Sequence, residues 1–304
     1  MKERLGGKKP NHSIDQLDTE QAKIGEDLIY HGRTTIDTKK TKRISTYFVC
    51  TDCHNLTREF DDISSQSSEE RLAYARKNGL PFLPGSTLWG IYNRTSFYNG
   101  DYSSKYGDLV VNARDSLKNA VQLCAKYCSS GRYLEDWELE SIMHYFKQHE
   151  LKLKDLNLSS TEQKGLLYYQ QLDEDEKKQL LEKLNQRHVQ AYNATFLPAM
   201  DVNVRKFGEG GDPEKGEVIY RKACLYCHKN KRVTYLHLDE DKLSARMFWK
   251  NIGKYNNKSL YQIIRYGTHS KAGRRQYMPN YTKEKMSDEQ LNDLVAYIKQ
   301  LAEK

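Results

Sequence analysis

The chain has 304 residues, of which 38% are hydrophobic, with a mean hydropathy of −0.87 and a net charge of +8. At about 150 residues per domain, this length predicts two domains. No run of about 18 apolar residues occurs, which excludes a membrane span, and no dense Lys/Arg tract or nucleic-acid motif points to a nucleic-acid partner. We expect the basic excess to attract a small anion; a solvated basic surface is the equally good alternative.

The first 13 residues, MKERLGGKKPNHS, contain no apolar stretch and are not a signal peptide. The first chemical motif then follows at residues 50–54, which read C-T-D-C-H, and it recurs at residues 224–228 as C-L-Y-C-H. A C-x-x-C-H string attaches haem covalently through two thioethers, and its histidine ligates the iron. The expected attachment and ligand residues are Cys50, Cys53, His54, Cys224, Cys227 and His228. A zinc site made of both C-x-x-C pairs is the alternative, but it leaves the two histidines unexplained.

A short amphipathic helix is predicted ahead of each haem string, because residues 25–30 (GEDLIY) and 216–220 (GEVIY) form a faint internal repeat. Each half also closes with a stronger helix, from 135 to about 151 and from 287 to about 301, where apolar residues recur at helical spacing. This order of helix, haem string and helix resembles that of small cytochrome c domains. We therefore predict an all-α fold with two covalently attached c-type haems.

The first half offers a cysteine as the sixth iron ligand. No methionine occurs between His54 and the closing helix, whereas Cys124 and Cys128 precede that helix. A thiolate ligand would lower the potential of the iron. His144 and His149 compete with the cysteines as ligands, and a free cysteine is more often a small buried hydrophobe. A disulfide between the two cysteines is awkward at helical spacing of four.

The middle of the chain, residues 152–194, is highly charged and helical in pattern, especially over 173–190. A turn-rich stretch at 207–213 then predicts a boundary. We expect a first domain over 1–150, a helical linker or insert over 151–205 and a second domain over 206–304.

In the second half, Met278 lies 50 residues after His228, is followed by proline and precedes the closing helix. A methionine thioether raises the haem potential. We expect His228/Met278 ligation, with His269, Lys271 and Met286 as the alternative sixth ligands.

Residues 119–146 resemble the cysteine-ligand segment of the thiosulfate dehydrogenase family (TsdA) and of the related SoxA subunits of sulfur oxidation. Gly131 follows Cys124 by seven residues and precedes a helix with aromatic residues, as in that family. Residues 83–92 look like the family segment between the haem string and the ligand cysteine. The order of a His/Cys haem and then a His/Met haem also matches.

The resemblance implies that two thiosulfate ions are joined into tetrathionate, or the reverse, with Cys124 as both iron ligand and reaction centre. It implies that electrons leave through the second haem to a redox partner such as a small cytochrome. Because covalent haem attachment takes place outside the cytoplasm, we expect an exported, periplasmic protein whose leader is missing from this sequence.

A dianionic substrate needs fixed cations. Where the family has an arginine, four residues before the cysteine, this chain has Ala120, and Cys128 stands where the family often has serine. A second thiol there could hold a persulfide or be structural. The candidate cations are Arg58, Arg94, Arg114, Lys118 and Arg132.

Three other functions stay open. One is SoxA-type coupling of thiosulfate to a cysteine of a carrier protein. Another is a dihaem electron-transfer or redox-sensing cytochrome without sulfur chemistry. The third is a dihaem peroxidase, which needs an open iron position. Cys124 distinguishes them, because a pure electron carrier does not need a low-potential thiolate ligand.

Overall fold

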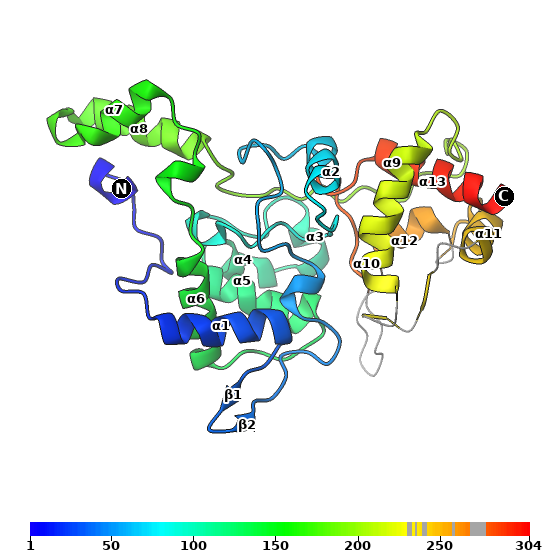
Figure 1. The fold of residues 1–304 in the computed structure, drawn as a ribbon, viewed down its shortest axis with the longest axis horizontal. Helices are drawn as coiled ribbons and strands as arrows, with labels where there is room; N and C mark the ends of the chain where they lie inside the picture. The colour runs from blue at the N-terminus through cyan, green and yellow to red at the C-terminus, as the bar shows by residue number, and fades with distance from the viewer. Residues whose placement is uncertain (230–232, 235, 239–241, 257–258, 268–277) are drawn as a thin grey trace.

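The computed structural model describes residues 1–229, 233–234, 236–238, 242–256, 259–267 and 278–304. These residues are mostly helical, as the sequence predicts, and Figure 1 shows a first half beside a smaller second half. The exception is a two-stranded antiparallel hairpin, β1 (Thr35–Ile36) with β2 (Lys39–Lys40), which the all-α prediction did not include. None of the helices in the described ranges is both long and apolar enough to cross a bilayer.

The first half is built around two crossing helices, α1 (Thr19–His31) and α6 (Asp136–Gln148). They are the two helices that the sequence predicts to open and to close this half. Gly25 of α1 lies against α6 so closely that a Cβ there would overlap the Ser141 carbonyl and come within 2.9 Å of the Tyr145 Cβ. Glycine therefore sets the distance between these helices. Along the chain, α1 and α6 are separated by α2 (Ser68–Lys77), α3 (Tyr102–Tyr106), α4 (Leu109–Arg114) and α5 (Leu117–Leu123).

The second half repeats this crossing with α9 (Pro213–Ile219) and α13 (Asp288–Glu303). A Cβ on Gly216 would overlap the Asp293 carbonyl and come within 2.8 Å of the Tyr297 Cβ. The faint sequence repeat thus has the same structural cause in both halves. The Ser287 hydroxyl accepts the amide hydrogen of Gln290 at 3.1 Å and caps α13. The other α-helices among the described residues of this half are α10 (Leu225–His228), α11 (Lys242–Asn251) and α12 (Leu260–Tyr266).

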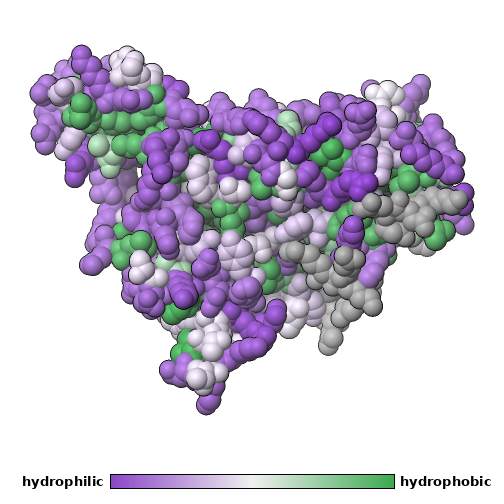
Figure 2. Space-filling view, viewed as in Figure 1, coloured by the Kyte–Doolittle hydropathy of each residue, from purple (hydrophilic) through white to green (hydrophobic). Residues whose placement is uncertain are grey.

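The middle segment carries α7 (Ser160–Leu167) and α8 (Glu174–Gln186), which project from the first half at the upper left of Figure 1. Figure 2 shows apolar residues exposed among polar ones over this projection. Its small core contains Leu166, Leu180 and Leu184, and it also includes Leu5 from the N-terminus. The helix predicted over 173–190 is confirmed as α8, which ends at Gln186, four residues before the predicted end.

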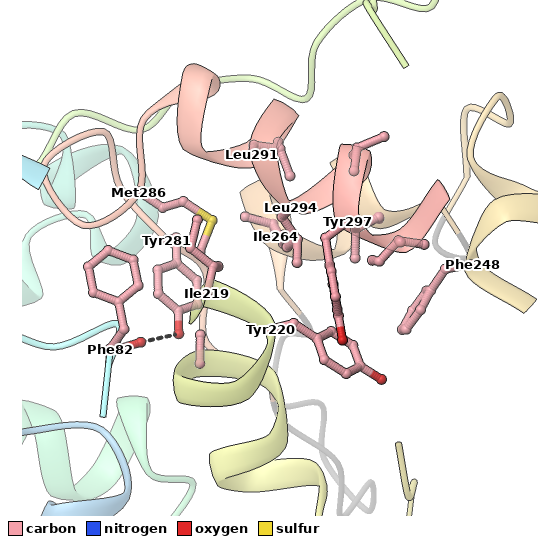
Figure 3. Close-up of a cluster of buried hydrophobic side chains, with 14 of the residues drawn as sticks. Phe82, Ile219, Tyr220, Phe248, Ile264, Tyr281, Met286, Leu291, Leu294 and Tyr297 are labelled. Atoms are coloured by element: carbon pink, nitrogen blue, oxygen red, sulfur yellow. Dashed lines mark hydrogen bonds between the residues drawn. The ribbon is translucent and has the colours of Figure 1, made fainter. Parts of the chain in front are cut away.

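Residues of the first half contribute to the apolar core of the second half, a contact that the sequence did not indicate. Leu72 and Ala75 of α2, with Phe82 after it, pack into the core of the second half. Figure 3 shows Phe82 beside Tyr281, whose hydroxyl donates to the Phe82 carbonyl at 3.0 Å. The Phe82 amide in turn donates to the Lys222 carbonyl at 3.0 Å. Part of the predicted first domain therefore stabilises the second.

We predict that Gly25→Ala and Gly216→Ala each destabilise the holoprotein. Overpacking costs about 1–3 kcal/mol, which exceeds the gain of about 0.5–1 kcal/mol from replacing a helical glycine. Urea unfolding followed by circular dichroism measures the change. Gly165→Ala in α7 is the matched control, because its Cβ would meet only the Leu180 side chain at 3.2 Å. Wild-type stability of Gly216→Ala would show that the helices can separate without cost.

Candidate haem sites

The first C-x-x-C-H string forms a short 3-10 helix, Cys50–Asp52, at the wall of a large cavity in the first half. The Asp52 carboxylate fixes its start by accepting the Val49 amide hydrogen at 2.8 Å. Cys50, Cys53 and His54 all line the cavity, which contains about 1640 Å³ of space not filled by protein, part of it open to solvent.

His54 is oriented as an iron ligand requires. Its Nδ1 lies 2.6 Å from the Ser86 carbonyl oxygen, so Nδ1 carries the proton and Nε2 keeps its lone pair. Gly85 closes the space behind the ring, since a Cβ there would lie 2.6 Å from two ring atoms. Burial lowers the pKa of His54 and favours the neutral imidazole that a metal binds.

A buried ion pair holds the loop behind His54. Arg71 Nη2 lies 2.7 Å from Glu59 Oε1, and both side chains are 2% exposed. Arg71 also donates to the Leu83 carbonyl at 2.7 Å, and the Thr87 amide donates to Glu59 at 3.1 Å. Burial alone would raise the pKa of Glu59, but Arg71 and Lys285 outweigh it and lower this pKa to about 2.

Cys124 and Cys128 line the same cavity as the first haem string. They begin and end a five-residue π-helical turn that continues α5, a rare geometry that is frequent at functional sites. The Tyr106 and Tyr98 hydroxyls lie 3.2 and 3.6 Å from Cys128 Sγ. The hydrogen bond from the Cys124 thiol, together with these phenols, lowers the pKa of Cys128 against the opposing effect of burial.

His144 and His149, the alternative iron ligands, are not among the residues that line this cavity. His144 Nδ1 accepts the Asp18 amide hydrogen at 3.1 Å. His149 Nδ1 lies 2.9 Å from the Tyr145 carbonyl, and its ring is tilted against that of Tyr145 at a centroid distance of 4.3 Å. Both imidazoles therefore have structural partners near α6.

Arg94 is the one predicted cation that lies in the wall of the cavity. It is buried, donates to the Thr87 carbonyl at 2.6 Å and lies over the Tyr192 ring. Arg58 instead donates to the Asp155 carbonyl and lies over Trp89. The remaining candidates are Lys118 and Arg132, which pair with Glu140 and Glu138, and Arg114 at the end of α4.

Two lysines that the sequence analysis did not select also line the cavity. Lys285 is buried beneath the Tyr192 ring, and burial lowers its pKa to about 7. Lys105 donates to Asn280 Oδ1 at 2.7 Å. No local pattern marks either lysine, because they reach the cavity from α3 and from the second half.

The second haem string has the same histidine geometry. His228 ends α10, and its Nδ1 lies 2.9 Å from the Leu236 carbonyl, leaving Nε2 for a metal. Met278 is half-buried, and the residues just after it reach the wall of the first cavity. Met286 is 1% exposed in the core beside Tyr281, which makes it a packing residue (Figure 3). His269 and Lys271 lie outside the described residues.

The two haem strings are in direct contact. The Tyr226 hydroxyl, within the second string, donates to the carbonyl of Thr51, within the first, at 3.0 Å. Cys53 of the first string and Cys227 of the second are close enough for their charges to interact. Groups attached to both strings would therefore be neighbours.

Comparison with known proteins identifies part of the chain. Residues 211–298 match the family described as cytochrome c oxidase, cbb3-type, subunit III. No curated protein and no solved structure matches the chain. The matched segment includes Cys224, Cys227, His228 and Met278. It is a cytochrome c domain, which implies a covalently bound c-type haem and electron transfer.

We predict that Glu59→Gln lowers the free energy of unfolding by about 3–5 kcal/mol at neutral pH, because it leaves the buried Arg71 charge uncompensated. The native pKa of Glu59 is about 2 against a usual 4.5. Its stabilising contribution is therefore complete above pH 4.5 and is lost as the pH falls through 2.

Urea unfolding of the wild type and the variant between these pH values measures this effect, and the difference should shrink toward the acid end. Glu162→Gln is the control, because it removes a similarly short pair with Arg187 in the more exposed insert and should cost less. A constant difference at every pH would contradict the role of the Glu59 charge.

Proposed function

We propose that the protein is a dihaem c-type cytochrome that couples two thiosulfate ions to tetrathionate, or performs the reverse reaction, at a thiolate-ligated haem in the first half. The balance is 2 S₂O₃²⁻ → S₄O₆²⁻ + 2 e⁻. The observation that supports this proposal is the position of Cys124. Its thiol lines the same cavity as Cys50, Cys53 and His54, which together form a haem attachment string.

The cavity fits a haem in the donors it offers. The thiols of Cys50 and Cys53 and the imidazole of His54, whose tautomer is fixed, line the cavity. The thiols of Cys124 and Cys128 line it as well. When bound, the haem would supply one-electron redox chemistry. Cys124 would hold the iron, and the thiol region would bind the sulfur substrate.

The positively charged side chains of the cavity could bind the anionic groups of a haem or of a substrate. Arg94 and Lys285 are buried in the cavity wall, and Lys105 lines it near the thiols. A haem carries propionates, and thiosulfate is a dianion, so positive groups are needed for both. Arg58 and Lys118, with their protein partners outside this wall, are weaker candidates for binding substrate.

The second half would accept the two electrons and pass them to a redox partner such as a small cytochrome. The cytochrome c match over 211–298 supports this role, and His228 with Met278 would ligate the second haem. The hydrogen bond between Tyr226 and Thr51 supports electron transfer between neighbouring strings. We propose a periplasmic location, where covalent haem attachment and a soluble partner would be available.

A second candidate is an electron-transfer or redox-sensing cytochrome without sulfur chemistry. The cytochrome c match favours it, because a cytochrome c domain implies electron transfer and does not by itself indicate a substrate. The two candidates differ at Cys124, whose thiolate the first one needs for turnover.

We predict two haems per chain. The pyridine haemochrome spectrum and the intact mass of the holoprotein should both give this number. Cys50→Ala combined with Cys53→Ala should remove one haem, and Cys224→Ala combined with Cys227→Ala should remove the other, because each pair forms two thioethers. One haem in the wild type would contradict the dihaem proposal.

We predict that thiosulfate reduces the haems anaerobically and yields tetrathionate when an external oxidant is present. Cys124→Met should lower turnover to the level without protein, because the proposed reaction needs a thiolate at the iron and a thioether cannot supply one, while dithionite still reduces both haems. The visible α-band and a tetrathionate assay measure both effects.

Thiosulfate that fails to reduce the wild type, in protein that dithionite does reduce, would refute the sulfur proposal and favour the second candidate. Wild-type turnover by Cys124→Met would refute the role of this cysteine.

A further inference from the structure

Cys128 has the more polar surroundings of the two free thiols in the first cavity. Two phenol hydroxyls, those of Tyr98 and Tyr106, lie within hydrogen-bonding distance of its Sγ. Cys124 has the Cys128 thiol as its hydrogen-bonding neighbour. Hydroxyl donors stabilise an anionic sulfur and the charge that develops on it during a displacement.

The tyrosines form a rigid wall around this thiol. The Tyr98 ring makes edge contacts with Tyr102 and Tyr106, at centroid distances of 5.0 and 6.2 Å. Tyr102 also makes an edge contact with Phe196 of the linker. This packing fixes the positions of the two hydroxyls, so the donors are preorganised around Cys128.

Lys105 supplies positive charge to the same place. It lines the cavity, and it is close enough to Cys128 for the two charges to attract. Its ammonium group is positioned by Asn280 of the second half. An anionic sulfur compound that reaches Cys128 would therefore meet a cation beside the thiol.

We propose that Cys128 is the thiol that accepts sulfur from the substrate, while Cys124 holds the iron. This inference rests on the function proposed above and divides between two cysteines the roles that one cysteine would otherwise combine. The substrate class is a small sulfur oxyanion with a sulfur–sulfur bond, such as tetrathionate.

The reaction with tetrathionate balances without an added oxidant. Cys128 Sγ attacks one of the two inner sulfurs and forms a new sulfur–sulfur bond, while its proton passes to solvent. The central sulfur–sulfur bond of tetrathionate breaks, and thiosulfate leaves with the electron pair. Cys128 is oxidised to an S-thiosulfonate and the leaving sulfur is reduced, as in thiol–disulfide exchange.

The first test maps the adduct. In the holoprotein four of the six cysteines are haem thioethers, so only Cys124 and Cys128 can react. The protein is treated anaerobically with one equivalent of tetrathionate and digested with trypsin. Cleavage at Lys126 separates the cysteines into peptides 119–126 and 127–132. We expect the S₂O₃ mass on peptide 127–132; an adduct only on 119–126 would overturn the proposal.

Two serine variants separate the roles. Cys124→Ser should lose the spectroscopic signature of a thiolate-ligated haem and still form the adduct. Cys128→Ser should keep that signature and form none. The opposite result, in which Cys124→Ser forms no adduct and Cys128→Ser does, would overturn the assignment. This test does not depend on any measurement of turnover.

Lys105→Met tests the anion site. We expect its reaction with tetrathionate to slow about tenfold, the loss of one interaction with a charged group, and its reaction with a neutral aromatic disulfide to keep the wild-type rate. Lys126→Met is the matched control, because that ammonium lies over the exposed Tyr133 ring. Equal slowing with both reagents, or none with either, would refute the role of Lys105.

The two proposals fail separately. An adduct on Cys128 without thiosulfate-dependent haem reduction would refute the proposed function and leave the thiol site standing. Wild-type thiosulfate oxidation by Cys128→Ser would refute the thiol assignment and leave the function standing.

Discussion

The buried ion pair between Arg71 and Glu59 is the interaction on which the orientation of His54 in the first cavity depends. A charge in a protein interior costs several kcal/mol unless a partner and hydrogen bonds compensate it. Arg71 and Glu59 compensate each other, and Arg71 also donates to the carbonyls of Leu83 and Gly85. These carbonyls belong to the loop that orients His54. Because Arg71 comes from α2, whose apolar residues pack in the second half, the orientation of the first histidine depends on the docking of both halves.

The sequence predicts features whose causes are local. Helical spacing of apolar residues marks the two closing helices. The faint repeat around Gly25 and Gly216 is also visible. Its reason is not visible in the sequence, since it is the backbone of a distant helix that excludes a Cβ at each glycine.

The remaining features depend on contacts between distant parts of the chain. Phe82 reads as part of the first half, and only the fold places it beside Tyr281. Lys105 and Lys285 carry no motif, whereas Arg58 looked suitable because it follows the first haem string closely. In the structure Arg58 turns toward Trp89 and the insert. Proximity in sequence is a poor guide to a cavity whose walls come from the first half, the linker and the second half.

The cations of the first cavity divide into two groups with different surroundings. Arg94 and Lys285 both lie over the Tyr192 ring and act electrostatically on His54, so they belong to the histidine side. Lys105 belongs to the thiol side, beside Cys128. In the proposed function, haem propionates and a sulfur oxyanion are both negative, and these separate cations would allow both to be bound without competition. The second half contributes to each group, through Lys285 directly and through the asparagine that positions Lys105. It therefore completes the first cavity as well as carrying its own haem string.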